Sequence, residues 1–587
     1  MKSTLTILLF SPHSAIWIHA FPEALIAEAL QQENHRIVYV GCGEEFQSFC
    51  VCMSAYGLKQ SSSEQEKKAI CKICNKQKEI IKNNFKFDGY DISKLVTETE
   101  RARTELILQK TTFQNFLELK IDGIELGRIA LYELLLQYKK SNLNFSKNEW
   151  SSYLISLKNT LISFFASRRI LDKEKPDRVL TYNSLYSVNQ VCCQLAESRG
   201  IPTYFLHAGS NLSNRLETMM LGTKSTYAFN ENLKDYWNTY KQIPCSHDSL
   251  KLVTDHFLHL FEGKHFLAYS SAKIDKIDIR DLFKVKENQK ILVAAMSSND
   301  ESFAAEAINA IPQYDNLIFP QQIDWIQFVI EFVRYRPDLF LIIRVHPREF
   351  PNKRDSVRSE YAQILEKVFK NLPDNVKLNL PEDHLSIYDL AEYTDLFLNC
   401  LSSVGEEMSL LGIPVLIYSS DLVAYPSEIN YVATSQEDFC QKIDVALADG
   451  WSFERVRTTY RWYVLKLVRS IFDISDSVRW YETNSSAKKP TYQQILVNFI
   501  YRIYYKILFT ILRNNTRVNY NERIQDCKKR ATSLKAQKVI SKLIQDKKNI
   551  VLDIINQEEE PSIDLSTETE ALKHEISRLS NRFFRRI

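Results

Sequence analysis

The sequence predicts an α/β protein with two parallel-sheet domains, and four stretches support this prediction. Thr4–Phe10 and Arg36–Val40 are apolar runs of strand length on either side of a helical pattern, so the chain opens as a strand–helix–strand unit. Lys290–Ala295 begins a second series of strands. Asp395–Tyr418 has the pattern of a buried strand, a short helix, a glycine stop and another apolar strand. Strands that alternate with helices in this way form parallel sheets covered by helices.

The expected elements divide the 587-residue chain into four parts. An N-terminal acceptor domain is expected at 1–228, with a helical insertion at about 93–171, where apolar residues recur every three or four positions. A helical bridge follows at 229–283, and the second α/β domain, the nucleotide-sugar domain, at 284–483. The remaining part, 484–587, is expected to be a helical tail.

Composition and charge are those of an ordinary soluble globular protein. Hydrophobic residues make up 45% and charged residues 25%, and 75 Lys and Arg against 72 Asp and Glu leave a net charge of +3. This balance does not favour nucleic acid as a partner. The apolar run Leu5–Phe10 is too short for a signal peptide, and no run of about 20 apolar residues predicts a membrane span. Eleven cysteines in such a chain favour reduced thiols and a cytoplasmic location.

Two histidines follow strands of the first domain. His13 lies in the loop after the first strand, where Ser11-Pro12-His13-Ser14 replaces the glycine-rich turn of a dinucleotide site. This loop is a candidate acceptor contact or a plain connection. His207 follows the predicted strand Thr203–Leu206, at the edge where open α/β sheets bind ligands. Because imidazole titrates near neutral pH, His207 is a candidate general base, with a hydrogen-bonded turn histidine as the alternative.

Cysteines gather near the N-terminus. Cys71 and Cys74 have the spacing of half a zinc knuckle, and Cys42 with Cys50 supplies the other two thiolates of a tetrahedral site, with Cys52 as an alternative ligand. The sequence therefore predicts a structural zinc site here, and scattered reduced thiols are the alternative. No spacing of histidines or carboxylates predicts a catalytic metal.

The strand Leu339–Val345 leads into Arg344-Val-His346-Pro-Arg348-Glu349. Arg344, His346 and Arg348 alternate, so on an extended segment their side chains share one side. Two arginines and a histidine suit a pyrophosphate that gains charge as a sugar departs. The alternative is a surface turn whose arginines pair with nearby carboxylates.

The strand–helix–strand unit Asp395–Tyr418 leaves unpaired backbone N–H groups at the start of its helix. Ser402, Ser403 and Gly405 lie there, and such a helix start favours phosphate. Glu407 follows one turn later, where it can accept hydrogen bonds from a sugar or ribose hydroxyl. Ser298, in the loop after Lys290–Ala295, is a candidate phosphate contact or a helix cap.

The segment 492–513 is apolar and aromatic but is interrupted by Arg502 and Lys506. These charges argue against a membrane span, whereas tyrosines beside basic residues suit a helix at a membrane surface. The alternative is an amphipathic helix that packs on the protein or on a partner.

Three motifs resemble a known family: Leu341–Glu349, with arginine-x-histidine-proline; Asn399–Glu407, a serine-rich turn followed by glycine-x-glutamate; and Leu411–Val415. They resemble the bacterial capsule and surface polysaccharide glycosyltransferases of the GT-B fold, and the CDP-glycerol glycerophosphotransferases are similar in the same places. The resemblance covers about 290–420. It implies two Rossmann-like domains facing a cleft, with a nucleotide-activated donor on the C-terminal domain and no catalytic metal. The absence of an Asp-x-Asp pair from the sequence agrees with the last point.

By position, the resemblance gives roles to individual residues. Arg344 and His346 would contact donor phosphate, the 402–405 turn would cap it, and Glu407 would hold a hydroxyl. The turn at His207 resembles the histidine-glycine turn of the glycerophosphotransferases, although Ala208 separates the two residues here.

The sequence therefore predicts a metal-independent glycosyltransferase that uses no cofactor in catalysis. Its expected partners are a nucleotide-sugar donor and a glycan or glycolipid acceptor, the latter at the inner face of the cell membrane. A CDP-polyol-phosphate transferase and a non-catalytic scaffold of a polysaccharide assembly complex are the alternatives.

Overall fold

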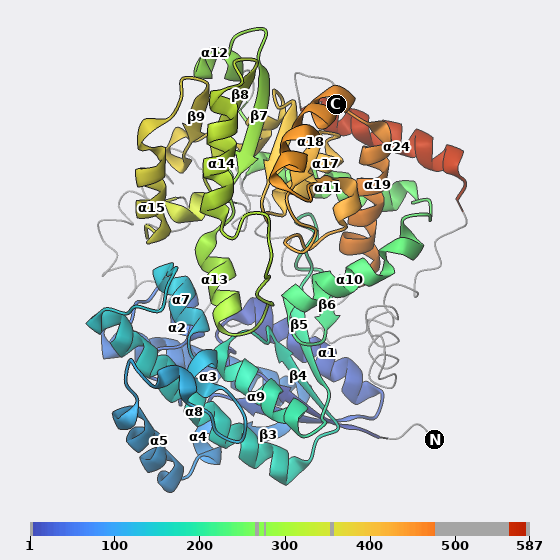
Figure 1. The fold of residues 1–587 in the computed structure, drawn as a ribbon. Helices are drawn as coiled ribbons and strands as arrows, with labels where there is room; N and C mark the ends of the chain where they lie inside the picture. The colour runs from blue at the N-terminus through green and yellow to red at the C-terminus, as the bar shows by residue number, and fades with distance from the viewer. Residues whose placement is uncertain (1–3, 264–268, 275–276, 353–356, 476–562, 583–587) are drawn as a thin grey trace, which may run out of the picture.

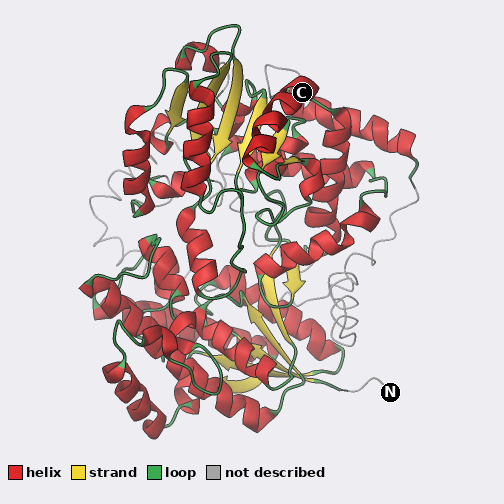
Figure 2. Ribbon diagram, in the orientation of Figure 1, coloured by secondary structure: helices red, strands yellow, loops and turns green. Residues whose placement is uncertain are grey.

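The computed structural model describes residues 4–263, 269–274, 277–352, 357–475 and 563–582. It contains two largely parallel sheets, one in the lower and one in the upper half of Figure 1. Helices surround both sheets, as Figure 2 shows. The predicted architecture of two α/β domains, each built on a largely parallel sheet, is confirmed.

The first sheet has the strand order β13-β6-β5-β4-β1-β2-β3. Neighbouring strands from β5 to β3 are parallel, whereas β6 is antiparallel to β5 and β13 is antiparallel to β6. The strands are β1 (Thr6–Phe10), β2 (Arg36–Gly41), β3 (Asp88–Asp91), β4 (Arg178–Tyr182), β5 (Thr203–Ala208), β6 (Thr218–Gly222) and β13 (Phe472–Asp473). The helices are α1 (Trp17–Gln32), α2 (Val51–Ala55), α3 (Glu64–Phe85), α4 (Ile92–Leu95), α5 (Glu98–Lys110), α6 (Leu126–Ile129), α7 (Tyr132–Tyr138), α8 (Lys147–Glu174) and α9 (Ser187–Ser198).

Both faces of the first sheet are buried, which explains why Ile7–Phe10 of the inner strand β1 is apolar at every position. In β1, Leu8 and Phe10 face the cluster formed by α8, α9 and the insertion helices. Ile7 and Leu9 face the opposite way, onto α1 and α3. Each such side chain stabilises the fold by about 1.5–3 kcal/mol through burial. The predicted insertion is helical (α4 to α8), but β3 was not predicted because Asp88–Asp91 is polar.

The second sheet is parallel throughout, with the order β12-β11-β10-β7-β8-β9. Its strands are β7 (Lys290–Ala295), β8 (Leu339–Arg344), β9 (Val376–Asn379), β10 (Leu396–Asn399), β11 (Val415–Ile417) and β12 (Tyr431–Val432). Its helices are α13 (Asn299–Ala307), α14 (Gln322–Arg334), α15 (Tyr361–Val368), α16 (Ile387–Ala391), α17 (Val404–Leu410), α18 (Gln436–Asp449) and α19 (Phe453–Val464). Three helices lie between the two sheets in the chain: α10 (Thr226–Tyr240), α11 (His247–Glu262) and α12 (Ile279–Phe283).

After α19 the chain crosses back to the first sheet. A π-helical turn, Leu465–Arg469, leads to β13, where Phe472 pairs with Met219 of β6. The predicted boundary at 483 placed Phe472 and Asp473 in the second domain, and this detail was wrong. The antiparallel pairing covers the otherwise open edge of β6, which local sequence patterns do not reveal.

A last helix, α24 (Leu565–Ser580), packs on α11 and α19. Leu572, Ile576 and Leu579 join the hydrophobic core there. Arg461 of α19 donates through Nε to Glu568 at 2.9 Å, and Arg578 donates to Asp255 of α11 at 2.6 Å. Helix α24 therefore shares the hydrophobic core of the second domain.

No helix in the described residues is both long and apolar enough to cross a membrane. The predicted membrane-surface segment 492–513 lies outside the described residues.

Candidate functional site

The loops at the carboxyl ends of the two sheets come together where the domains touch. Helix α13, which follows β7, packs against α7 of the first domain (Figure 1). The Arg348 Nη2 group, after β8, donates to the Leu136 carbonyl at 2.9 Å. Tyr132 interacts electrostatically both with Tyr186, which follows β4, and with Glu301, which follows β7. Open α/β sheets bind ligands at their carboxyl edges, so this region is the candidate site.

A small cavity lies at the carboxyl edge of the first sheet, where α1 meets the loops after β1 and β4. His13 packs edge-on against Tyr186, with ring centroids 5.4 Å apart. His19 stacks flat on Tyr182 at 4.0 Å. The cavity is lined by Phe10, Ser11, Pro12, His13, His19, Ala20, Glu23, Tyr182, Tyr186 and Asn189.

Three buried polar atoms at this cavity have no hydrogen-bond partner among the described residues: His13 Nε2, Glu23 Oε1 and Asn189 Oδ1. Their side chains belong to residues that are 8%, 2% and 1% exposed. A buried polar atom left unsatisfied costs about 1–3 kcal/mol, so proteins normally pair such atoms with water or a ligand. The cavity is therefore equipped to receive a hydroxyl group or a water molecule.

The titratable groups at the cavity are shifted by burial. Burial raises the pKa of Glu23 to about 8, although Ser11 Oγ donates a hydrogen bond to this carboxyl group at 2.6 Å. Burial lowers the pKa of His13 to about 4 and, with nearby cationic groups, that of His19 to about 3. Near neutral pH Glu23 therefore retains its proton, and the two imidazoles are neutral and able to accept one.

His207, the predicted base, lies within β5 rather than just beyond it. The centroid of its ring lies 5.5 Å from that of Tyr182, and the Tyr182 side chain also lines the polar cavity. Nδ1 lies 3.0 Å from the Ala208 carbonyl, a distance at which the Nδ1–H donates and leaves Nε2 as an acceptor. Burial and the charge of Arg215 lower the pKa of His207 to about 4. These contacts fit either a base or the hydrogen-bonded histidine of the alternative prediction.

Arg344 and His346 lie at the carboxyl end of β8 as predicted. Arg344 is buried, and its Nη1 donates to Asn379 Oδ1 of β9 at 2.5 Å. Burial lowers its pKa to about 10, against the attraction of Asp383 and Asp389. His346 Nδ1 accepts a hydrogen bond from the Arg348 backbone at 3.2 Å, and burial lowers its pKa to about 4.

Arg348 lies in a turn and not on the extended segment that the predicted alternation with Arg344 and His346 assumed. Pro347 begins a 3₁₀ turn (Pro347–Glu349), which ends the extended segment that the alternation required. The Arg348 Nε donates to both oxygens of Asp300, at 3.0 and 2.7 Å, and Nη1 donates to Tyr269 at 3.1 Å. With Nη2 on the Leu136 carbonyl, its guanidinium connects the two domains, and its role towards a donor stays a prediction.

The predicted phosphate turn lies at the start of α17, but its first backbone N–H groups are already paired. The Gly405 N–H donates to the Ser402 carbonyl at 3.2 Å and the Glu406 N–H to the Ser403 carbonyl at 3.1 Å. Ser403 is the N-cap of α17, and Ser402 Oγ accepts a hydrogen bond from the Val404 N–H at 3.3 Å. Gly405 is required by packing, because a Cβ there would lie 2.2 Å from Tyr425 Oη. Glu407 accepts a hydrogen bond from the Tyr388 hydroxyl at 2.7 Å.

Two carboxyl groups near this turn differ in their surroundings. Burial raises the pKa of Glu407 to about 7, so this group titrates near neutral pH. The buried Glu406 accepts hydrogen bonds from Trp462 at 2.6 Å and Lys466 at 2.5 Å. Ser298 donates to Glu301 at 2.5 Å and makes no side-chain cap bond, so its predicted donor contact stays a prediction.

Glu23, His19 and Asn189 were not predicted as site residues. One signal was present for Glu23, because a carboxylate within the otherwise apolar stretch Ala20–Ala27 of α1 has to be buried. Nothing local marks Asn189, whose Nδ2 donates to the Tyr182 carbonyl at 2.9 Å. Its position in the cavity depends on how α9 packs beside β4.

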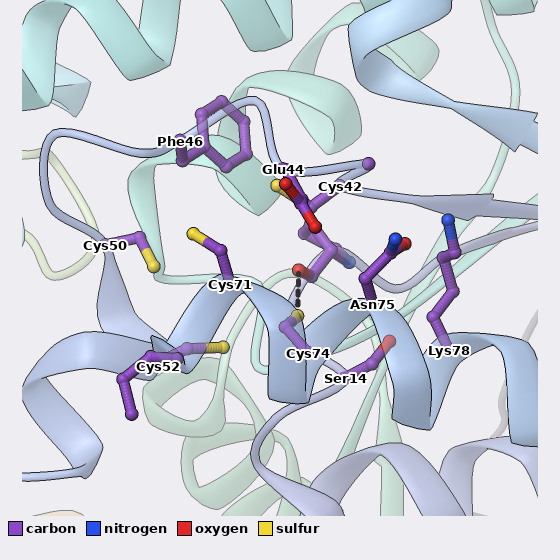
Figure 3. Close-up of a pocket in the computed structure, with 13 residues that line it drawn as sticks. Ser14, Cys42, Glu44, Phe46, Cys50, Cys52, Cys71, Cys74, Asn75 and Lys78 are labelled. Atoms are coloured by element: carbon purple, nitrogen blue, oxygen red, sulfur yellow. Dashed lines mark hydrogen bonds between the residues drawn. The ribbon is translucent and has the colours of Figure 1, made fainter. Parts of the chain in front are cut away.

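The five N-terminal cysteines converge on a second pocket of the first domain (Figure 3). The cysteines in the described residues are free thiols. In that part of the chain, three ligand atoms all within 4.8 Å of one another are found at His247, His574 and Glu575, not at the cysteines. Glu575 of α24 contacts His247 of α11 and also His574 and Arg578 of its own helix, so these ion-pair contacts join α24 to α11.

No protein-family model and no curated protein matches the sequence. Among solved structures, the chain is similar to a UDP-GlcNAc 2-epimerase from Neisseria meningitidis, with 12% identity over 78% of this chain and 96% of that one and a TM-score of 0.25. It is similar to a β-Kdo 2,4 transferase, KpsC, from Thermosulfurimonas dismutans, with 13% identity, 49% and 80% coverage and a TM-score of 0.30. A glycosyltransferase from Rickettsia africae gives 8% identity, 81% and 95% coverage and a TM-score of 0.29. These identities and TM-scores are too low to transfer a function, so the function is argued from the residues of this chain.

Proposed function

We propose that the protein is a glycosyltransferase that moves a sugar from a nucleotide-activated donor to a growing surface or capsular polysaccharide on a lipid carrier. The observation that carries this proposal is the polar cavity of His13, Glu23 and Asn189. It presents unsatisfied polar atoms at the carboxyl edge of one sheet, beside the domain contact that also holds the Arg344–His346 segment of the other sheet.

In this proposal the acceptor hydroxyl enters the cavity and a neutral imidazole takes its proton. His13 and His207 both have lowered pKa values, so both are unprotonated near neutral pH. The oxygen then attacks the anomeric carbon of the donor sugar, and the bond from that carbon to the nucleotide phosphate breaks. Glu23, which retains its proton, donates a hydrogen bond to the acceptor and does not serve as the base.

The departing phosphate gains negative charge and needs positive charge or N–H groups to stabilise it. In this proposal Arg344 supplies positive charge and the His346 imidazole supplies an N–H group, since its Nδ1 already accepts a hydrogen bond. The hydroxyl groups of Ser402 and Ser403 are the further donors. Glu407 accepts a hydrogen bond from a hydroxyl group of the sugar or ribose, as it does from the Tyr388 hydroxyl in this structure. We further propose that no metal takes part and that 492–513 holds the enzyme at the inner membrane face.

The direct test is a thermal-shift panel on the full chain with CMP, CDP and UDP, followed by transfer assays with the corresponding nucleotide sugars. At least one nucleotide is expected to raise the melting temperature, and His346→Ala is expected to abolish this shift. Arg334→Ala is a matched control, because Arg334 lies in the same domain but pairs only with exposed Glu331 on its own helix. If no nucleotide stabilises the chain, the transferase proposal is refuted and the scaffold alternative gains support.

A further inference from the structure

Five thiols from three separate segments face one pocket of the first domain. Cys42 follows β2, Cys50 and Cys52 lie at the start of α2, and Cys71 and Cys74 lie one turn apart on α3. In Figure 3 the sulfur atoms of the last four are turned towards a common space, with Cys42 on the far side of Glu44. Of the eleven cysteines in the chain, nearly half are thus gathered at one point.

The fold brings these thiols together, because the loop after β2, the start of α2 and one face of α3 meet at this pocket. Within the described residues, no three of the five sulfur atoms lie within 4.8 Å of one another.

We propose that Cys50, Cys52, Cys71 and Cys74 bind one zinc ion, with Cys42 as a fifth thiol beside the site. Four thiolates satisfy tetrahedral zinc, and each binds at about 2.3 Å. Zinc binding would draw the four sulfur atoms closer together than they stand in this structure. This set is the one predicted from spacing, with the alternative ligand Cys52 in place of Cys42.

The metal would support the loop that carries the polar cavity. Cys74 Sγ lies 3.9 Å from the Pro12 carbonyl oxygen, a contact in which the thiol no longer donates once it binds zinc as a thiolate, and Ser14 in the same loop lines the cysteine pocket. Pro12 lines both the cysteine pocket and the polar cavity. Fixing α3 and the start of α2 to one ion would hold this shared wall in place. The site is nevertheless independent of the proposed function, since metal content is measured without any substrate.

The experiment uses the full chain purified without chelators. Elemental analysis is expected to find about one zinc per chain, and zinc is expected to protect four thiols from a thiol reagent. Replacement of zinc by Co²⁺ is expected to give the thiolate charge-transfer bands of a tetrahedral sulfur site. Serine at any one of the four positions should weaken Co²⁺ binding at least as much as the roughly 10–100-fold loss seen for outer-shell partners.

Two variants act as controls. Cys42→Ser is expected to keep the stoichiometry and the Co²⁺ spectrum, which separates the fifth thiol from the ligands. Cys440→Ser changes a half-buried cysteine on α18 of the second domain and should have no effect. A folded wild-type chain with no zinc, no thiol protection and no thiolate bands with Co²⁺ would overturn the proposal. Unchanged Co²⁺ affinity in Cys71→Ser and Cys74→Ser would do the same.

Discussion

The buried carboxyl group of Glu23 makes the stability of the first domain depend on pH in an unusual direction. Its pKa is raised to about 8 from an ordinary value of 4.5, because burial penalises the charged form. Between these two values the folded state binds more protons than the unfolded state. Stability contributed by this group is therefore complete at low pH and is lost as pH rises towards 8.

Replacing Glu23 with glutamine removes this titration while keeping the shape of the side chain. One pKa unit corresponds to 1.36 kcal/mol, so the variant should gain about 2–3 kcal/mol over the wild type between pH 5 and 7 and roughly 4–5 kcal/mol by pH 9. For a domain of this size each kcal/mol shifts the melting temperature by about 2–4 °C. The difference in melting temperature between variant and wild type should thus grow by about 10 °C over this pH range.

The assay is a series of thermal melts of both proteins from pH 5 to pH 9. Glu98→Gln provides the baseline for removing a carboxylate, since the Glu98 side chain is 94% exposed. A difference between Glu23→Gln and wild type that stays constant from pH 5 to pH 9 would refute the raised pKa. It would also remove the argument that Glu23 donates a hydrogen bond to the acceptor.

The remaining predictions concern the second domain and the tail. Gly405→Ala should destabilise the chain by about 1–3 kcal/mol and weaken nucleotide binding, because the new Cβ would lie 2.2 Å from Tyr425 Oη; an unchanged melting temperature contradicts this. Glu568→Ala should cost about 1–3 kcal/mol, because the half-buried Arg461 and the Cys245 N–H lose their acceptor, and limited proteolysis should then release the C-terminal helix earlier than in wild type. Deleting 492–513 should move the protein from the membrane fraction to the soluble fraction of cells, and an unaltered distribution argues against the membrane contact.

The periodicity and apolar runs of the sequence determine most elements. A run such as Ile7–Phe10, apolar at every position, indicates a strand covered on both faces, and the structure buries it in that way. The positions of the Arg344–His346 segment and of the turn at Ser403 were likewise predictable from the apolar runs that precede them. Each follows a strong strand, and the carboxyl end of a parallel strand is fixed once the strand is recognised.

Only the tertiary structure decided which groups meet. The Arg348 guanidinium contacts Asp300, Tyr269 and Leu136, from 48 to 212 residues away in the chain, and no local pattern predicts such partners. The polar cavity likewise combines Glu23 of α1 with Asn189 of α9, which become neighbours because β1 and β4 pair side by side. Local patterns report whether a side chain is buried, because burial follows the period of the element. They do not report what it is buried against, because that depends on how distant elements pack.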